Sequence, residues 1–291
     1  MSMSKRRTQR QQELWICATD IVTPAGHPFY QALNRLLEEH AFDAFVEERC
    51  AAFYAVTLGR PSIPPGVYFR MLLIGYFEGI DSERGIAWRC ADSLGLRAFL
   101  GYALHQKTPD HSSLSVIRGR LDIETHREVF QWVLKVLAKS DLLQGKTLGV
   151  DATTLEANAA LRSIVRRDTG QPYEAFLCDL AQASGIETPT REDLAKIDRK
   201  RPKKGSNDEW YNPHDPDAKI TKMKDGRTHL AHKAEHAVDL ETGAIVAVTL
   251  QPANAGDTTT VKKTLDETEA NLAEVRDDPE TSDYLASDEI R

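Results

Sequence analysis

The spacing of apolar residues changes once along this 291-residue chain, near Gly145, and that change most constrains the fold. Before it, apolar side chains recur every three or four residues, as between Phe29 and Leu37, which is the period of an amphipathic helix. After it, residues 146–154 form a short apolar and β-branched run, which is typical of a strand. The pattern therefore predicts an all-α N-terminal domain followed by an α/β domain.

The helical domain is expected over residues 27–142, after a basic, solvated arm at residues 1–26. Pro28 suits the first turn of one helix, and Pro64 and Pro65 are expected to start another. Asp81 or Ser82 is expected to cap a further helix, and Asp110 or Ser112 another. The clearest amphipathic run is 124–139, whose expected buried side comprises Val129, Phe130, Val133, Val136 and Leu137.

The second domain is expected over residues 143–291 and begins with a strand that ends at Asp151. A long polar insertion at about 157–228 follows, with helices predicted near residues 173–184 and 188–198. Strands at 229–240 and 244–250 then flank a turn in which Gly243 accepts a positive φ. Asp257 is expected to cap the next helix. This order predicts the opening of an α/β ribonuclease-H-like domain with a long polar and helical insertion.

Composition limits the functional classes. The net charge of −7 argues against a nucleic-acid partner, although much of the net negative charge lies in the tail from Asp266 onward. We expect no membrane span and no secretory signal, and therefore a cytoplasmic protein. The four cysteines are far apart and are expected to be reduced thiols. They are Cys17, Cys50, Cys90 and Cys178.

Asp151 is the first candidate for chemistry. A carboxylate at a strand end can bind a hard divalent cation, which two-metal phosphoryl transfer requires. The structural alternative is that Asp151 caps the turn that follows the strand.

Basic residues in the insertion form the second candidate, a phosphate-contacting segment. The expected DNA-binding residues there are Arg199, Lys200, Arg201, Lys203, Lys204, Lys222 and Lys224. Trp210 and Tyr211 lie between these clusters and could stack on bases. Arg118 and Arg120 are candidate DNA contacts in the helical domain, or they pair with acidic neighbours. The alternative for the insertion is a solvated loop.

Three histidines, His229, His232 and His236, offer a metal site only if they share one helical face. The turn and the valine-rich partner segment favour a strand, on which His229 points away from the other two. Phosphate-binding glycine loops and serine nucleophile elbows are absent from the sequence.

Several segments, in their order and spacing, resemble the DDE transposases of bacterial insertion sequences. The resemblance covers most of residues 28–275. In the helical domain it rests on Ser82–Cys90, Phe99–Gly101 and Pro109–Leu121. In the second domain it rests on Gly149–Ala157, His232–Asp239 and Gln251–Asp257.

The resemblance implies a ribonuclease-H-like catalytic domain that holds two Mg²⁺ ions with two aspartates and a glutamate. Asp151 matches the first aspartate, as both catalytic residue and metal ligand. The segments that carry the second aspartate and the glutamate are not found, so the chain is expected to be C-terminally truncated and inactive alone. The family implies DNA as partner, both transposon ends and target, and a homodimer on paired ends.

The sequence is also consistent with two other hypotheses. The chain could be a non-catalytic DNA-binding remnant that occupies transposon ends. It could also be a metal-dependent hydrolase unrelated to DNA, built on Asp151 and the histidines. Residues 143–291 are expected to be poorly stable in isolation, because a half sheet leaves a strand edge unpaired.

Overall fold

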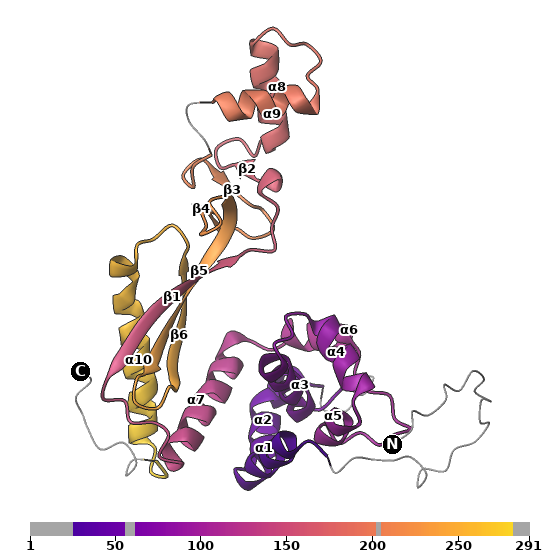
Figure 1. The fold of residues 1–291 in the computed structure, drawn as a ribbon, viewed down its shortest axis with the longest axis vertical. Helices are drawn as coiled ribbons and strands as arrows, with labels where there is room; N and C mark the ends of the chain where they lie inside the picture. Colours follow the sequence, from indigo (N-terminus) through magenta and orange to yellow (C-terminus); the bar gives the residue numbers. More distant parts are fainter. Residues whose placement is uncertain (1–25, 56–61, 202–204, 282–291) are drawn as a thin grey trace, which may run out of the picture. The chain divides into compact units, whose positions relative to one another are not determined.

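A computed structural model describes residues 26–55, 62–201 and 205–281 of the chain (Figure 1). Its contacts divide the chain into two units, Met1–Phe130 and Gln131–Arg291, which are described separately below. The division falls inside a helix, somewhat earlier than the 142/143 boundary expected from the sequence. No helix among these residues is both long enough and apolar enough to cross a bilayer.

The described part of the first unit contains helices and no strand, so this part is all-α as expected. Its elements are α1 (Pro28–Glu39), α2 (Phe42–Cys50), η2 (Ala51–Phe53), α3 (Pro65–Glu78), α4 (Glu83–Asp92), α5 (Leu94–Phe99), α6 (His111–Arg118) and the start of α7 (Ile123–Lys139).

Local chemistry explains where these helices begin. Pro28 and Pro65 are the first residues of α1 and α3, where the missing N–H of proline costs nothing. The Ser82 hydroxyl accepts the Gly85 N–H at 3.1 Å and caps α4. The Asp110 carboxylate accepts the Ser112 N–H at 3.0 Å and caps α6. Of the two alternatives at each site, Ser82 and Asp110 are therefore the caps.

A buried cation joins three helices in the core of this unit. Arg70 of α3 is 6% exposed, and its guanidinium binds both carboxylate oxygens of Asp43 on α2, at 2.5 and 2.9 Å. Its Nε donates to Asn34 of α1 at 3.1 Å. The bidentate geometry fixes α2 against α3, and the third bond adds α1.

The amphipathic helix α7 exists as predicted, but its buried side is rotated. Leu134, Val136 and Ala138 are buried, whereas Val133 is 37% exposed. The prediction for Val133 is therefore wrong. Leu134 and Ala138 are four positions apart, so they lie on the same side of the helix. This side is next to the one that was predicted from the valines.

The second unit is built on an antiparallel sheet of β1 (Leu148–Glu156), β4 (Lys219–Lys222), β5 (Thr228–Asp239) and β6 (Ile245–Pro252). The central strand is β5, which pairs with β1, β4 and β6. The residues Ala231–Asp239 of β5 pair with β1, and the residues Thr228–Ala231 pair with β4. The N-terminal end of β5 therefore extends beyond the region that it shares with β1 and β6 (Figure 1).

The expected hairpin joins β5 to β6, and Gly243 in its turn has a φ of 79°, as predicted. Helix α10 (Asp257–Asp277) follows β6 and packs on one face of the sheet (Figure 1). The expected cap is wrong, however. Gly256 is the N-cap, and the Asp257 carboxylate instead accepts a hydrogen bond from Lys233 Nζ at 3.0 Å.

The insertion between β1 and β4 has a small core of its own. It contains η3 (Leu161–Ser163), β2 (Val165–Arg166), α8 (Tyr173–Ala183), α9 (Arg191–Lys200) and β3 (Trp210–Tyr211). Its buried cluster consists of Ile164, Trp210, Ala218 and Leu230, so it is anchored on β5. Both predicted insertion helices are present, and Thr190 caps α9 in a capping box with Asp193.

The sequence of strand, insertion, hairpin and helix agrees with the expected order. Among the described residues, β1 pairs only with β5, so its other edge has no strand partner. The structure is thus a mixed α/β arrangement with a small antiparallel sheet.

Candidate functional site

Asp151 lies within β1 rather than at its end, because the strand continues to Glu156. The predicted strand boundary was therefore wrong. In the register, Asp151 pairs with His236 of β5, which in turn pairs with Val248 of β6. Directly opposite residues of neighbouring strands share a face, so these three side chains form a row across the sheet.

This row lies on the sheet face that α10 does not cover. Lys233 and Glu235 of β5 bind residues of α10, and side chains alternate along a strand. His236 and its partner Asp151 therefore face the other way. Asp151 is exposed there, and His236 is half-buried. A carboxylate in this position is open to solvent and to any ligand that approaches this face.

Exposed leucine and valine side chains lie on the same face of the sheet as Asp151. Leu155 is 47% exposed, Val248 50% and Leu250 58%. They pair with His232, His236 and Ala234 respectively, which places them on the same side of the sheet as Asp151. We call these three residues the open sheet face. The solvent-facing side of an antiparallel sheet usually carries polar side chains, and the open sheet face is more apolar than that.

The described residues contain no group of three His, Cys, Asp or Glu side chains that could hold a metal ion. The three histidines are on a strand, as predicted, and two of them are engaged elsewhere. His229 binds Glu156 and Asp225 at 2.7 and 3.0 Å, and His232 binds Asp215 at 2.9 Å. Both carboxylates accept hydrogen bonds from the imidazole ring, and this raises the pKa of His229. A histidine-based metal centre therefore has no geometric support within these residues.

The two arginines predicted in the helical unit are both at the surface. Arg118, at the end of α6, is 62% exposed and forms a 3.0 Å ion pair with Glu83. Arg120 lies with its guanidinium 5.3 Å from the centre of the Tyr54 ring. An exposed ion pair is weak and can be exchanged for a phosphate contact.

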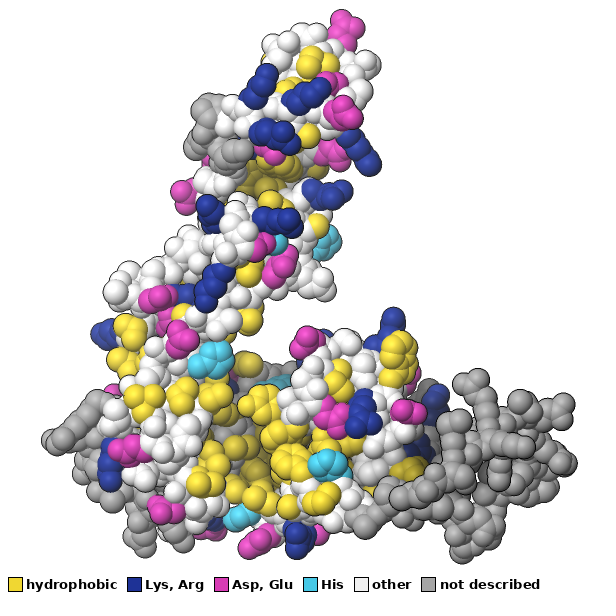
Figure 2. Space-filling view, viewed as in Figure 1, with side chains coloured by type: hydrophobic (Ala, Val, Ile, Leu, Met, Phe, Trp, Pro, Cys, Tyr) yellow, Lys and Arg dark blue, Asp and Glu magenta, His cyan; other side chains and the backbone are white. Residues whose placement is uncertain are grey.

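The basic residues of the insertion do not form one patch. Arg199 and Lys200 are exposed at the end of α9, and Lys222 and Lys224 are exposed in the β4–β5 hairpin. Arg201 is only 13% exposed and binds Asp198 at 2.9 Å. Lys203 and Lys204 lie outside the described residues. Figure 2 shows acidic side chains interspersed among the cations over this part of the chain.

Trp210 does not offer a stacking surface. It is 2% exposed and packs in the insertion core against Tyr173 and Phe176, with ring centroids 5.1 and 5.2 Å apart. The expectation that it could stack on bases is therefore wrong. Tyr211 is half-buried, and the Arg167 guanidinium covers it at 4.9 Å.

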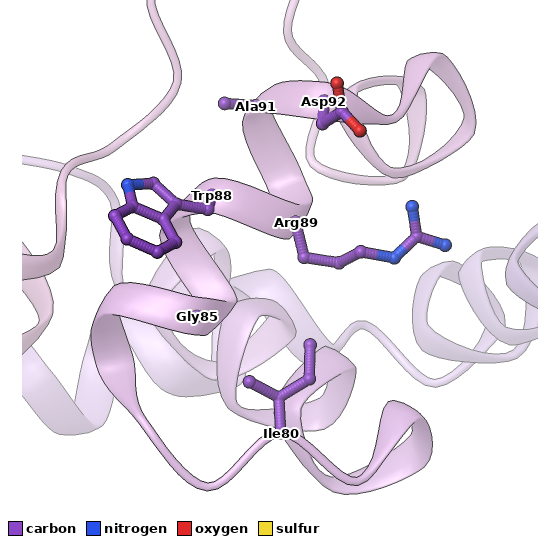
Figure 3. A pocket seen from close by; sticks show the side chains of 6 residues that line it. All are labelled: Ile80, Gly85, Trp88, Arg89, Ala91 and Asp92. Atoms are coloured by element: carbon purple, nitrogen blue, oxygen red, sulfur yellow. The ribbon is translucent and has the colours of Figure 1, made fainter.

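An exposed tryptophan on α4 was missed by the sequence analysis. Trp88 is 69% exposed and lines a wide, shallow depression of about 670 Å³ in the helical unit. Figure 3 shows Trp88 and Arg89 leaving α4 in different directions. A signal existed, because Trp88 is two positions from both Ile86 and Cys90, which are buried, and therefore lies on the opposite side of the helix.

Comparison with protein families adds independent information about the helical unit. Residues 17–120 match the family model of the Transposase domain (DUF772), which is about a third of the chain and extends through α6. The match supports a transposase, and such a domain implies an interaction with DNA in general. No curated protein and no solved structure matched the chain.

Proposed function

We propose that this protein acts in DNA transposition and that its first task is to bind transposon-end DNA. The match of residues 17–120 to a transposase domain carries the proposal. The exposed cations support it, since Arg118 in the helical unit and Lys222 and Lys224 in the insertion are available to phosphates. Specificity for particular ends would come from additional contacts to base edges.

The proposal extends to the transposase type. We place the second unit in the DDE group with a ribonuclease-H-like catalytic domain. The antiparallel order β1, β5, β6, followed by α10, supports this proposal, because it agrees with the order expected at the beginning of such a domain. Asp151 on the open side of that sheet is its candidate first carboxylate.

The described residues do not fit a two-Mg²⁺ site. Asp151 is the one carboxylate that the sequence motif supplies, and no metal-binding group of three surrounds it in the described chain. Two Mg²⁺ ions require several oxygen ligands held in near-octahedral geometry. This polypeptide alone is therefore proposed to bind DNA without cutting it.

Binding and cleavage can be tested on the same sample. The full chain is incubated with labelled duplexes taken from both sides of its reading frame, and a base-shuffled duplex serves as the control. We expect retention of an end duplex over the shuffled one and no nicking with Mg²⁺. Asp151→Asn should leave the affinity unchanged.

Equal affinity for shuffled and end duplexes would remove the proposed role at transposon ends. Mg²⁺-dependent nicking that disappears in Asp151→Asn would show that the site is complete in this polypeptide, and would overturn the inference of binding alone.

A further inference from the structure

A pocket of about 570 Å³ opens in the insertion of the second unit. It is formed by η3, α8, α9, β4 and the start of β5, and it is partly enclosed. Its lining includes Arg162, Ile164, Tyr173, Asp198, Ile220 and Thr228. The volume falls in the range of small-ligand sites.

The floor of the pocket is apolar and fixed. Ile164 is 2% exposed and belongs to the insertion core with Trp210. Ile220 packs against the same core, and the Tyr173 ring meets the Trp210 ring edge-on at 5.1 Å. Because these groups are held by the core, they offer a preformed surface for a flat aromatic ligand rather than a surface that must first be ordered.

A carboxylate inside the pocket is held in one orientation. Tyr173 donates its hydroxyl hydrogen to Asp198 Oδ1 at 2.6 Å, and Arg201 donates to the same oxygen at 2.9 Å. Burial, together with Asp198, raises the pKa of Tyr173 to about 12, so the hydroxyl stays a donor. Asp198 Oδ2 receives no hydrogen bond from the described residues and is therefore available to a ligand N–H.

A cation completes the lining. Arg162 is exposed and forms no ion pair within the described chain. Thr228, at another side of the pocket, is the first residue of β5, next to the hairpin that carries exposed Lys222, Lys224 and Arg227. A phosphate chain that crosses the pocket would thus meet positive charge both at the pocket and beside it.

We propose that this pocket binds a single unstacked nucleobase with an exocyclic amine, on a DNA strand whose phosphates contact Arg162 and the β4–β5 hairpin. The inference rests on the proposed DNA-binding function and deepens it. The amine donates to Asp198 Oδ2, as cytosine does to acidic side chains. The apolar floor replaces the stacking that the base loses when it leaves its neighbours.

The test compares three 12-nucleotide single strands by fluorescence anisotropy with the full chain: oligo-dC, oligo-dT and an abasic backbone. Cytosine and thymine are similar in size, but only cytosine has an exocyclic amine. We expect oligo-dC to bind about five- to tenfold more tightly than oligo-dT. The abasic strand should bind most weakly.

Two substitutions at one lining position separate the pocket from other stacking sites. Ala160 lines the pocket and is exposed. Ala160→Leu, which fills the pocket, should remove the preference for oligo-dC and leave the affinity for the abasic strand unchanged. Ala160→Ser, which leaves it open, should behave as the wild type. Lys222→Ala should weaken binding to all three strands alike.

Equal affinity of the wild type for the three strands would overturn the pocket while leaving backbone binding, and hence the proposed function, intact. Failure to bind any strand or duplex would overturn both. If Ala160→Leu melts at a lower temperature than the wild type, the proposal is still tested by the affinities of the wild type for oligo-dC and oligo-dT.

Discussion

Two arginines of the helical unit show how much the surroundings of one side chain decide its effect. Arg118 is exposed and has one ion-pair partner, whereas Arg70 is buried and binds Asp43 and Asn34. Removing an exposed partner changes stability by about 0.2–1 kcal/mol. Removing one member of a buried pair costs about 3–5 kcal/mol, because the other charge stays desolvated. Because Asp43 is half exposed, we expect the loss of Arg70 to cost an amount at the lower end of that range.

This contrast predicts opposite outcomes for two alanine substitutions. Arg118→Ala should leave the melting temperature nearly unchanged and lower DNA affinity, with the salt slope of binding reduced by about one. Arg70→Ala should lower the melting temperature clearly. Circular dichroism melts and anisotropy titrations at several salt concentrations measure both. An unchanged affinity and salt slope in Arg118→Ala would remove this residue from the DNA contacts.

At the scale of elements, a buried polar network fastens α10 to β5. Lys233 and Glu235 are 4% and 2% exposed, and their side chains meet at 3.0 Å. Lys233 Nζ also donates to Thr260 at 2.8 Å, and Thr264 donates to Glu235 at 2.6 Å. Burial disfavours both charges, yet the hydrogen bonds to Asp257 and Glu235 hold the pKa of Lys233 above its usual value.

Breaking this pair should cost more than replacing it. Lys233→Met leaves Glu235 charged and buried, so we expect a loss of about 3–5 kcal/mol in unfolding free energy. Adding Glu235→Gln removes that charge and keeps an oxygen for the threonines, so the double variant should be more stable than Lys233→Met alone. Urea unfolding measures this, with exposed Lys224→Met as the control. If the double variant lost as much unfolding free energy as the two single variants together, the two residues would not be coupled.

The elements themselves were largely predictable, because their signals are local. Pro28 and Pro65 start helices, and Gly243 turns a hairpin, through the backbone geometry of each residue alone. The partnership of Lys233 with Asp257 was not predictable. In the sequence, Asp257 has the position of a helix cap, and only the packing of α10 on the sheet gives its carboxylate a lysine partner.

For the whole molecule, the candidate site is harder to predict than the fold. Asp151 could be chosen from its motif, but its neighbours across the sheet depend on the register of β5 and β6. The tryptophans show the same limit. Trp210 is buried although it lies in a polar segment, because its burial depends on contacts with distant segments, whereas the exposure of Trp88 follows from its position on α4.

A pH dependence follows from Asp239, which is fully buried at the base of the sheet. Burial raises its pKa, but N–H groups of Gly145, Gln144 and Glu241 outweigh that effect and hold the pKa below its usual value. The stabilisation is therefore present above the unfolded-state pKa of about 3.9 and is lost as the pH falls through the lower folded-state pKa. Glu235, whose pKa is also lowered, acts in the same direction.

Asp239→Asn should be less stable than the wild type at pH 7, and the difference should shrink below about pH 4. Urea unfolding of both chains between pH 7 and 2.5, followed by circular dichroism, gives the two curves. A difference that is constant over this range would mean that the carboxylate charge contributes nothing at this position.

The open sheet face and the free edge of β1 together predict how the whole molecule behaves at high concentration. Leu155, Val248 and Leu250 are 47–58% exposed on one side of the sheet. Among the described strands only β5 pairs with β1. Apolar surface next to an unpaired edge favours association between chains, since both the side chains and the backbone gain partners.

Leu250→Lys should therefore reduce self-association of the full chain in sedimentation velocity, without a large change in stability, because the side chain is already 58% exposed. A lysine at this position places charge on the apolar face and so opposes burial of that face between two chains. Leu142→Lys is the matched control, since Leu142 is 52% exposed but lies outside the sheet. If both variants associate like the wild type, the association surface is not the sheet. If both reduce association equally, net charge rather than this face controls it.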